Sequence, residues 1–260
     1  MLALLSPAKD LDFDSPILDI KATQPRLPEH SKDLMQTLKQ AQVADVAALM
    51  HLSEKLALLN YTRFQDWRWP QPKRRARQAI WAFNGDVYQG LQARSWAAED
   101  VAFAQSHVRI LSGLYGLLRP LDAILPYRLE MGTSLATERG RDLYQFWGET
   151  VTQLLNKDLK AEGSGLVVNL ASQEYFKVVK PKHVAGRIIE PVFKDYHAPS
   201  GTYKIISFFA KKARGQMCAY IVNNRLTQAD ELKSFSGDGY GYNAALSSGD
   251  TWVFTRRAEA

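Results

Sequence analysis

Short apolar runs alternate along this chain with longer stretches in which apolar residues recur every three or four positions. The short runs are rich in β-branched residues, which is typical of buried strands. They predict strands at 2–5, 166–170, 187–193, 203–209 and 251–255. The turn-forming residues 198–201 lie between two of these runs and predict a hairpin.

The longer stretches predict amphipathic helices, because a spacing of three to four residues places apolar side chains on one helix face. These helices are expected at 31–40, 43–61, 75–83, 97–108, 143–159 and 211–226. Strands near both ends with helices between them indicate an α+β (mixed α/β) fold. We expect a single domain over residues 1–260, with a mixed sheet flanked by helices.

The composition shows that the chain is basic, and it predicts a cytoplasmic location. The chain has 33 Lys and Arg residues against 27 Asp and Glu, a formal net charge of +6, which favours polyanionic partners. Cys218 is the single cysteine, so an internal disulfide is excluded. No window approaches 18 consecutive apolar residues, so we expect no membrane partner.

Familiar catalytic and cofactor motifs are absent from the sequence. The five histidines show no metal-ligand spacing, and the phosphate-loop, dinucleotide-binding and nucleophile-elbow strings do not occur. We therefore expect no metal and no cofactor, and no catalytic residue can be assigned. Cys218 has two interpretations, a buried inert thiol or a peroxide-sensing thiol whose pKa is lowered by nearby lysines.

A glycine-rich segment at 111–116 is the densest motif of the chain. Its glycines, Gly113 and Gly116, resemble the turn of a helix-hairpin-helix module, in which backbone N–H groups bind phosphate oxygens. Arg119 and Arg128 follow and would supply charge. The alternative is a tight turn in a buried loop.

A second candidate region combines basic and polar residues near predicted strand ends. Its cations are Lys9, Lys177, Lys180, Lys211, Lys212 and Arg214. The last three would open the helix at 211–226, where cations oppose the helix dipole, and an anion-binding site would explain them. Asn169, Glu130 and Glu174 are candidates for a polar pocket beside these cations.

Several motifs together resemble the YaaA family of bacterial peroxide-stress proteins, and the resemblance runs from end to end. They are Ser6-Pro7-Ala8-Lys9, Phe83-Asn84-Gly85-Asp86, Leu111-Ser112-Gly113-Leu114-Tyr115-Gly116, Asn169-Leu170-Ala171-Ser172-Gln173-Glu174 and Lys211-Lys212-Ala213-Arg214. The resemblance implies a cytoplasmic protein that protects against peroxide and is associated with lower free iron. It also implies a family-specific fold with a basic cleft and a helix-hairpin-helix-like element, and binding to double-stranded and structured DNA.

Three functional hypotheses follow from the residues and the resemblance together. The first is a protective protein that binds DNA without strong sequence preference through Lys9, Lys177, Lys180, Lys211, Lys212 and Arg214, with Arg119 and Arg128. The second is an enzyme that acts on a small anionic ligand, nucleotide-like or phosphorylated, in the same pocket. The third is direct iron sequestration. Asp10 departs from the family pattern beside Lys9 and would weaken that lysine as a phosphate ligand.

Overall fold

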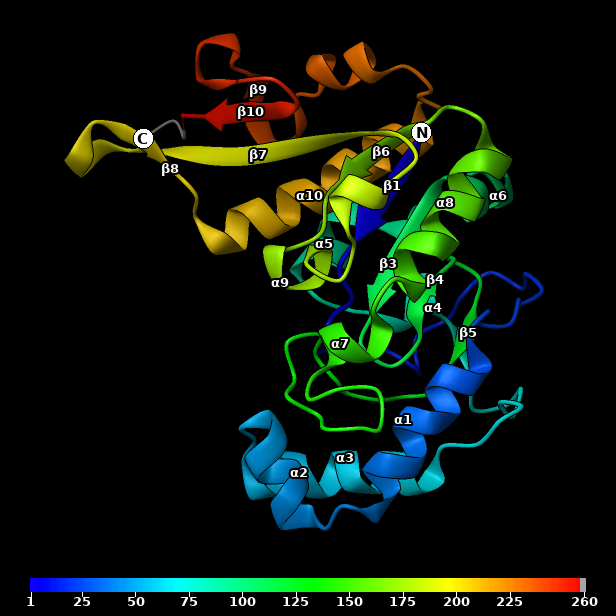
Figure 1. Cartoon of the computed structure of the whole chain (residues 1–260). Helices are drawn as coiled ribbons and strands as arrows, with labels where there is room; N and C mark the ends of the chain where they lie inside the picture. The colour runs from blue at the N-terminus through cyan, green and yellow to red at the C-terminus, as the bar shows by residue number, and fades with distance from the viewer. Residues whose placement is uncertain (258–260) are drawn as a thin grey trace.

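A central sheet organises the computed structural model, which describes residues 1–257 (Figure 1). Five strands run parallel: β1 (Leu2–Leu5), β3 (Val108–Ser112), β6 (Leu166–Asn169), β7 (Arg187–His197) and β10 (Thr251–Arg256). Three strands pair antiparallel with these: β4 (Gly116–Leu118), β8 (Thr202–Lys204) and β9 (Gly241–Tyr242). The mixed sheet expected from the apolar runs is thereby confirmed.

The parallel strands follow the order β3-β1-β6-β7-β10. The next parallel strand after β1 in the sequence, β3, lies on one side of β1, and the following one, β6, lies on its other side. This reversal between β1 and β6 is a topological switch point. Loops that leave the carboxyl ends of two such strands diverge and open a crevice there. All four residues of β1 and of β6 are buried, which explains their continuous apolar character. The topology therefore singles out the ends of β1 and β6 for a site.

Helices cover the sheet. The helix α10 (Ser207–Asn223) contacts β7 and β1, α6 (Ala98–His107) contacts β1 and β3, and α5 (Asp86–Leu91) contacts α10. Of the others, α8 (Thr150–Glu162) contacts β4 and α9 (Gln173–Phe176) contacts β3, while the Trp147 indole of α7 (Leu143–Trp147) donates to the Gly113 carbonyl between β3 and β4. Within residues 1–257, none of the helices combines the length and apolar character that a bilayer crossing requires.

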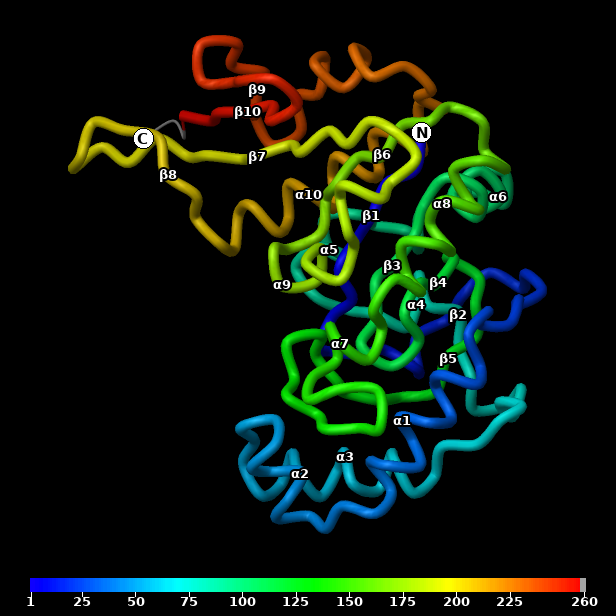
Figure 2. Tube along the Cα trace, in the orientation of Figure 1, coloured from blue at the N-terminus to red at the C-terminus, as the bar shows by residue number. Residues whose placement is uncertain are grey.

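Three helices lie together at the end of the molecule farthest from β7 and β10 (Figure 2). They are α1 (Pro28–Gln40), α2 (Val43–Met50) and α3 (Glu54–Asp66). The chain returns from them through β2 (Arg77–Gln78) and α4 (Ala79–Ala82), and β2 pairs with β5 (Ala123–Ile124). Short 3₁₀ turns complete the chain at Ala93–Ser95, Pro181–His183, Ala198–Ser200, Ala229–Ser234, Gly237–Gly239 and Ala244–Leu246.

Several predicted segments differ from the observed elements in their bounds or type. The expected helix at 43–61 is divided into α2 and α3 at His51, whose left-handed φ of 53° ends α2. Gly148, with a φ of 48°, likewise divides 143–159 into α7 and α8. Residues 75–83 form β2 and the short α4. The strand expected at 203–209 ends at Lys204, and α10 begins at Ser207 rather than at residue 211.

Two glycines bring α5 and α10 into close backbone contact. A Cβ on Gly215 of α10 would overlap the carbonyl oxygen of Val87, and a Cβ on Gly90 of α5 would overlap that of Lys212. Only glycine permits backbones to approach this closely. The contact matters for the site because α5 begins at Asp86 and α10 carries Lys211 and Arg214.

We predict that Gly215→Ala destabilises the protein by about 1–3 kcal/mol, the usual cost of overpacking a close contact. Gly241→Ala is the matched control, because a Cβ there would have nothing within 4 Å. The control should stay within about 0.5 kcal/mol of the unmodified chain. Urea unfolding followed by circular dichroism measures both. Equal midpoints for all three chains would show that the α5–α10 contact does not constrain the fold.

Candidate functional site

Two serines join the carboxyl ends of β1 and β6. The backbone N–H of Ser172 donates to the Ser6 hydroxyl oxygen at 2.9 Å, and the two hydroxyl oxygens lie 3.3 Å apart. The Ser172 hydroxyl also accepts from the Tyr175 N–H and caps α9. The Tyr88 hydroxyl of α5 donates to the Ser6 carbonyl at 3.0 Å. These bonds fix the two strand-end loops relative to α5.

A cavity of about 450 Å³, here named the carboxyl-edge cavity, opens at this point. Val87, Leu170 and Tyr175 give it an apolar part. Its charged lining consists of three cations and four carboxylates: Lys9, Lys211 and Arg214 with Asp10, Asp86, Glu130 and Glu174. The cavity is therefore of mixed charge, and its lining does not form the basic pocket expected from the sequence.

Arg214 is the exceptional cation of this lining. Its side chain is partly buried, and no hydrogen bond or ion pair reaches its guanidinium from any residue between 1 and 257. Burial lowers the pKa of Arg214, with Glu190 nearby acting in the opposite direction, yet a guanidinium remains charged at neutral pH. A recessed charge without a partner is costly unless a ligand supplies one.

The lysines of the cavity have carboxylate partners but remain exposed. Lys211 lies 3.6 Å from Asp86 with 51% of its side chain exposed, and Lys9 lies 3.0 Å from Glu130 with 66% exposed. Arg128 also binds Glu130, at 3.1 Å, and does not itself line the cavity. Burial opposes ionisation of Glu130, but Lys9 and Arg128 outweigh it and lower the pKa of this carboxyl.

Glu174 and Lys177 lie at the α9 side of the cavity. The Glu174 carboxylate accepts from the Gly132 N–H at 3.0 Å, and it makes no ion pair within the described chain. The Tyr144 hydroxyl donates to the Glu174 carbonyl, and the Lys177 ammonium lies 4.6 Å from the centre of the Tyr144 ring. Lys177 thus stands exposed beside α7 and α9.

An adjoining cavity of about 410 Å³ shares Ser172, Glu174 and Arg214 with the first. Asn169 lines this second space, but its side-chain oxygen accepts from the Ala171 N–H at 3.1 Å and shapes the turn after β6. The structure therefore brings together Lys9, Lys211, Arg214, Glu130, Glu174 and Asn169, with Lys177 beside them.

Two candidate lysines take no part in these cavities. The Lys212 ammonium binds Asp238 at 2.9 Å, because neighbouring residues of a helix point in different directions. Lys180 precedes the turn Pro181–His183, and its backbone N–H donates to the Thr152 hydroxyl of α8. Since α10 begins at Ser207, the basic residues 211–214 lie beyond its first turn, and the expected conflict with the helix dipole does not arise.

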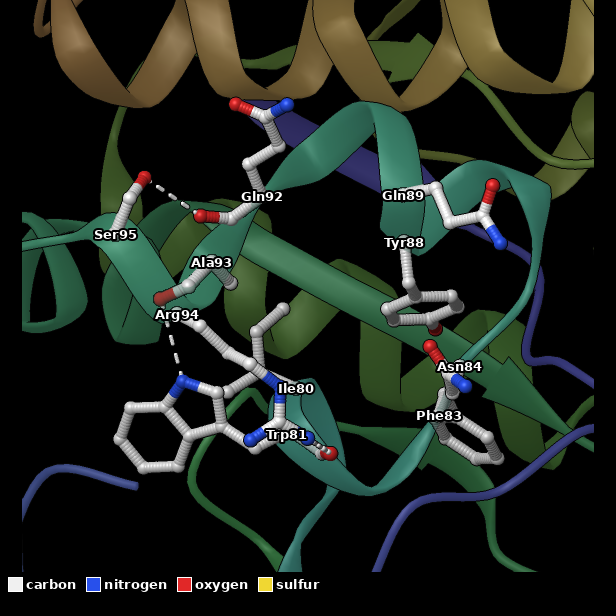
Figure 3. A pocket seen from close by; sticks show the side chains of 10 residues that line it. All are labelled: Ile80, Trp81, Phe83, Asn84, Tyr88, Gln89, Gln92, Ala93, Arg94 and Ser95. Atoms are coloured by element: carbon white, nitrogen blue, oxygen red, sulfur yellow. Dashed lines mark hydrogen bonds between the residues drawn. The ribbon is translucent and has the colours of Figure 1, made fainter. Parts of the chain in front are cut away.

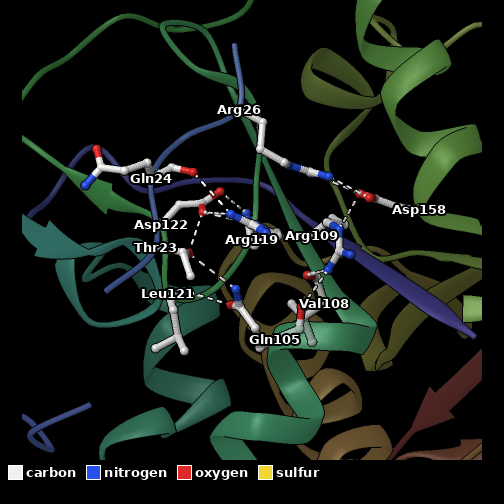
Figure 4. Close-up of polar contacts among 10 residues, drawn as sticks. All are labelled: Thr23, Gln24, Arg26, Gln105, Val108, Arg109, Arg119, Leu121, Asp122 and Asp158. Carbon is white, nitrogen blue, oxygen red and sulfur yellow. Dashed lines mark hydrogen bonds and ion pairs between the residues drawn. The ribbon is translucent and has the colours of Figure 1, made fainter. Parts of the chain in front are cut away.

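Arg119 does not line the carboxyl-edge cavity and belongs instead to the group of polar contacts that Figure 4 shows. Because β4 runs antiparallel to β3, Leu118 pairs with Ile110 and Arg119 reaches the amino end of β3. There its guanidinium binds the fully buried Asp122 at 2.8 Å, close to Arg26 and Arg109, which both bind Asp158. The structure thus separates Arg119 from Arg128, which binds Glu130 of the carboxyl-edge cavity, and DNA binding by either arginine stays a prediction.

The segment 111–116 is part of a β-hairpin and not of a helix-hairpin-helix element. Its residues form the end of β3 and the turn into β4, and all of them are buried. A Cβ on Gly113 would overlap the Leu129 carbonyl oxygen, and Gly116 has a φ of 69°. The glycines serve a tight buried turn, as the alternative interpretation held, and present no exposed anion-binding backbone.

Comparisons with known proteins identify the family to which this chain is similar. A family model described as "Peroxide stress protein YaaA" matches residues 1–246. A "UPF0246 protein" of Saccharophagus degradans is 59% identical over 257 residues, which is 99% of this chain and all of the relative. A similarly named protein of Teredinibacter turnerae is 57% identical over the same shares, and one of Cupriavidus metallidurans is 53% identical over the full length of both chains.

The chain belongs to the YaaA family of peroxide stress proteins. The resemblance seen in the sequence motifs is thus confirmed, and with it a general role in peroxide stress. Several of the motifs that carried the resemblance, from Ser6-Pro7-Ala8-Lys9 to Lys211-Lys212-Ala213-Arg214, contribute residues to the two cavities.

Four residues that line the carboxyl-edge cavity of this YaaA-family chain were not predicted from the sequence: Ser6, Ser172, Asp86 and Tyr175. A signal was present for the two serines, because each follows a buried apolar run by one to three residues. Parallel strands would bring both to the same edge. Asp86 offered no such signal, since its place depends on how α5 packs against α10.

Another hollow, of about 310 Å³, lies between α4 and α5 (Figure 3). Arg94 is the one charged side chain of its described lining, and the Asp12 carboxylate binds it at 2.7 Å. The charge of Arg94 is therefore already compensated within the protein. Across residues 1–257, no group of three or more His, Cys, Asp and Glu side chains is placed to hold a metal ion.

Cys218 is fully buried in α10, and burial raises the pKa of its thiol. We predict that native protein does not react with Ellman's reagent at pH 8, because the thiolate is the reactive form. The guanidinium-unfolded chain, with its single cysteine, should release one equivalent of chromophore. Rapid stoichiometric labelling of the native protein would instead favour the peroxide-sensing interpretation.

Proposed function

We propose that this peroxide stress protein acts by binding the phosphates of DNA at the carboxyl edge of its sheet. The observation that carries the proposal is Arg214, a guanidinium without a partner among the described residues, flanked by exposed lysines. Arginine is well suited to phosphate because its planar donors bind two oxygens together. Lys9, Lys177 and Lys211 would hold neighbouring phosphates at the rim.

The ion pairs of the rim lysines do not prevent this role. A surface pair such as Lys211–Asp86, at 3.6 Å, contributes at most about 1 kcal/mol, so a phosphate can replace the carboxylate at small cost. When Lys9 turns to a phosphate, Arg128 remains bound to Glu130 and keeps that carboxylate paired. The rim thus has cations that can exchange partners.

The proposed contacts address the sugar-phosphate backbone and not base edges. Such contacts carry no direct sequence information, so we expect similar affinity for different duplex sequences. Limitation of free iron remains part of the proposal as an outcome in the cell, and no iron ligand is assigned to the described residues.

Lys211 and Lys212 offer a matched pair of variants. We predict that Lys211→Ala weakens DNA binding, because Lys211 lines the carboxyl-edge cavity, while Lys212→Ala has little effect, because Lys212 binds Asp238 away from it. With about four phosphates neutralised, log affinity should fall against log salt with a slope of about −3.6, and Lys211→Ala should reduce the slope by about 0.9.

Fluorescence anisotropy with labelled duplex and bubble DNA over a salt series measures both quantities. Equal weakening by the two variants would assign the effect to net charge and not to this edge. A slope near zero, or no binding at low salt, would remove DNA as the partner.

A further inference from the structure

The charges of the carboxyl-edge cavity can be sorted by whether the protein already compensates them. Glu130 binds Lys9 and Arg128, and Asp86 faces Lys211. Asp10 is exposed at the rim and accepts from the Asn84 amide at 2.7 Å. What remains without an ion pair within residues 1–257 is one guanidinium, Arg214, with Glu190 of the adjoining cavity as its nearby opposite charge, and two carboxylates, Asp10 at the rim and Glu174 on the wall that the two cavities share.

Arg214 and Glu174 lie where the two cavities meet. Both residues line the carboxyl-edge cavity and the adjoining cavity, together with Ser172. No ion pair joins them, although they carry opposite charges and share these walls. An arginine and a glutamate held near each other but apart leave room for a ligand between them.

The position of the Glu174 carboxylate is fixed from two sides. Its Oε1 accepts from the Gly132 N–H at 3.0 Å, and a Cβ on Gly132 would lie only 3.2 Å from the same oxygen. Glycine at 132 therefore lets the loop approach the carboxylate closely. Ser172 starts α9 by capping it, which places Glu174 in its first turn. Oε2 of Glu174 remains available to a donor, since the Gly132 bond uses Oε1 alone.

The size and composition of the space indicate a small molecule. Volumes of about 450 Å³ and about 410 Å³ fall in the range of ligand pockets. Val87, Leu170 and Tyr175 offer apolar contact to a carbon skeleton. Four carboxylates against three cations disfavour a ligand of several negative charges inside the cavity, whatever binds at the rim.

We propose that the carboxyl-edge cavity binds a small zwitterionic molecule. Its anionic group, a carboxylate or a phosphate, binds Arg214, and its ammonium group binds Glu174. A ligand with both charges compensates both residues at once, whereas an anion alone leaves Glu174 without an ionic partner. The inference goes beyond DNA binding and does not depend on it: a DNA phosphate and the small molecule would compete for Arg214, and each is tested in the absence of the other.

Calorimetry with small probes tests this inference on the full chain. O-phosphoethanolamine and β-alanine each carry an ammonium and an anion on a two-carbon spacer, and they distinguish phosphate from carboxylate. The matched controls carry only one of the two groups: inorganic phosphate and propionate supply the anion alone, and ethanolamine supplies the ammonium alone. We expect one of the two zwitterions to bind about tenfold more tightly than its matched controls, which corresponds to about 1.4 kcal/mol for the second contact.

Two variants assign the contacts. Glu174→Gln should remove the advantage of the zwitterion over its anionic control, and Arg214→Gln should abolish binding of both. Circular dichroism confirms folding, and because Glu174 is exposed, its variant decides the question even if Arg214→Gln does not fold.

The inference is overturned if neither zwitterion binds at millimolar concentration, if each binds no better than its matched controls, or if Glu174→Gln leaves the advantage intact. Because the probes contain no polymer, these outcomes are independent of whether the protein binds DNA.

Discussion

The close approach of α5 and α10 at Gly90 and Gly215 is the constraint on which the rest of the site depends. It holds Asp86, at the start of α5, opposite Lys211 on α10, and it places Arg214 over the ends of β1 and β6. Tyr88 connects α5 to the loop after β1 through the Ser6 carbonyl. Removing this contact would separate the cations from the strand ends that complete the cavity.

Much of the fold could be predicted from local pattern, because buried parallel strands are short continuous apolar runs and their carboxyl ends meet at one edge. Lys9 and Glu174 were found for this reason. The partners of charged side chains could not be predicted in the same way. Lys211 and Lys212 are adjacent in sequence but bind carboxylates on different elements, and Arg119 does not line the cavity because β4 reverses direction.

The positions of the charged side chains show that the basic composition says little about the site. Many cations of this YaaA-family chain are bound to carboxylates, as in the Arg26–Asp158–Arg109 network, and serve the fold. The net charge of +6 is therefore a weak guide to the site. Arg214 is informative because its guanidinium lacks such a partner within residues 1–257. The lysines at the rim are available to neighbouring phosphates of DNA, whereas Arg214 is the residue for which a DNA phosphate and a small molecule would compete.

The central claim is that Arg214 is available to an anion, and phosphate-dependent thermal stability tests it most directly. A ligand that binds only the native state raises the melting temperature as its concentration exceeds the dissociation constant. At constant ionic strength, replacing chloride by phosphate should raise the melting temperature of the unmodified protein and should have little effect on Arg214→Gln. An equal rise in both proteins, or none in either, would contradict the account.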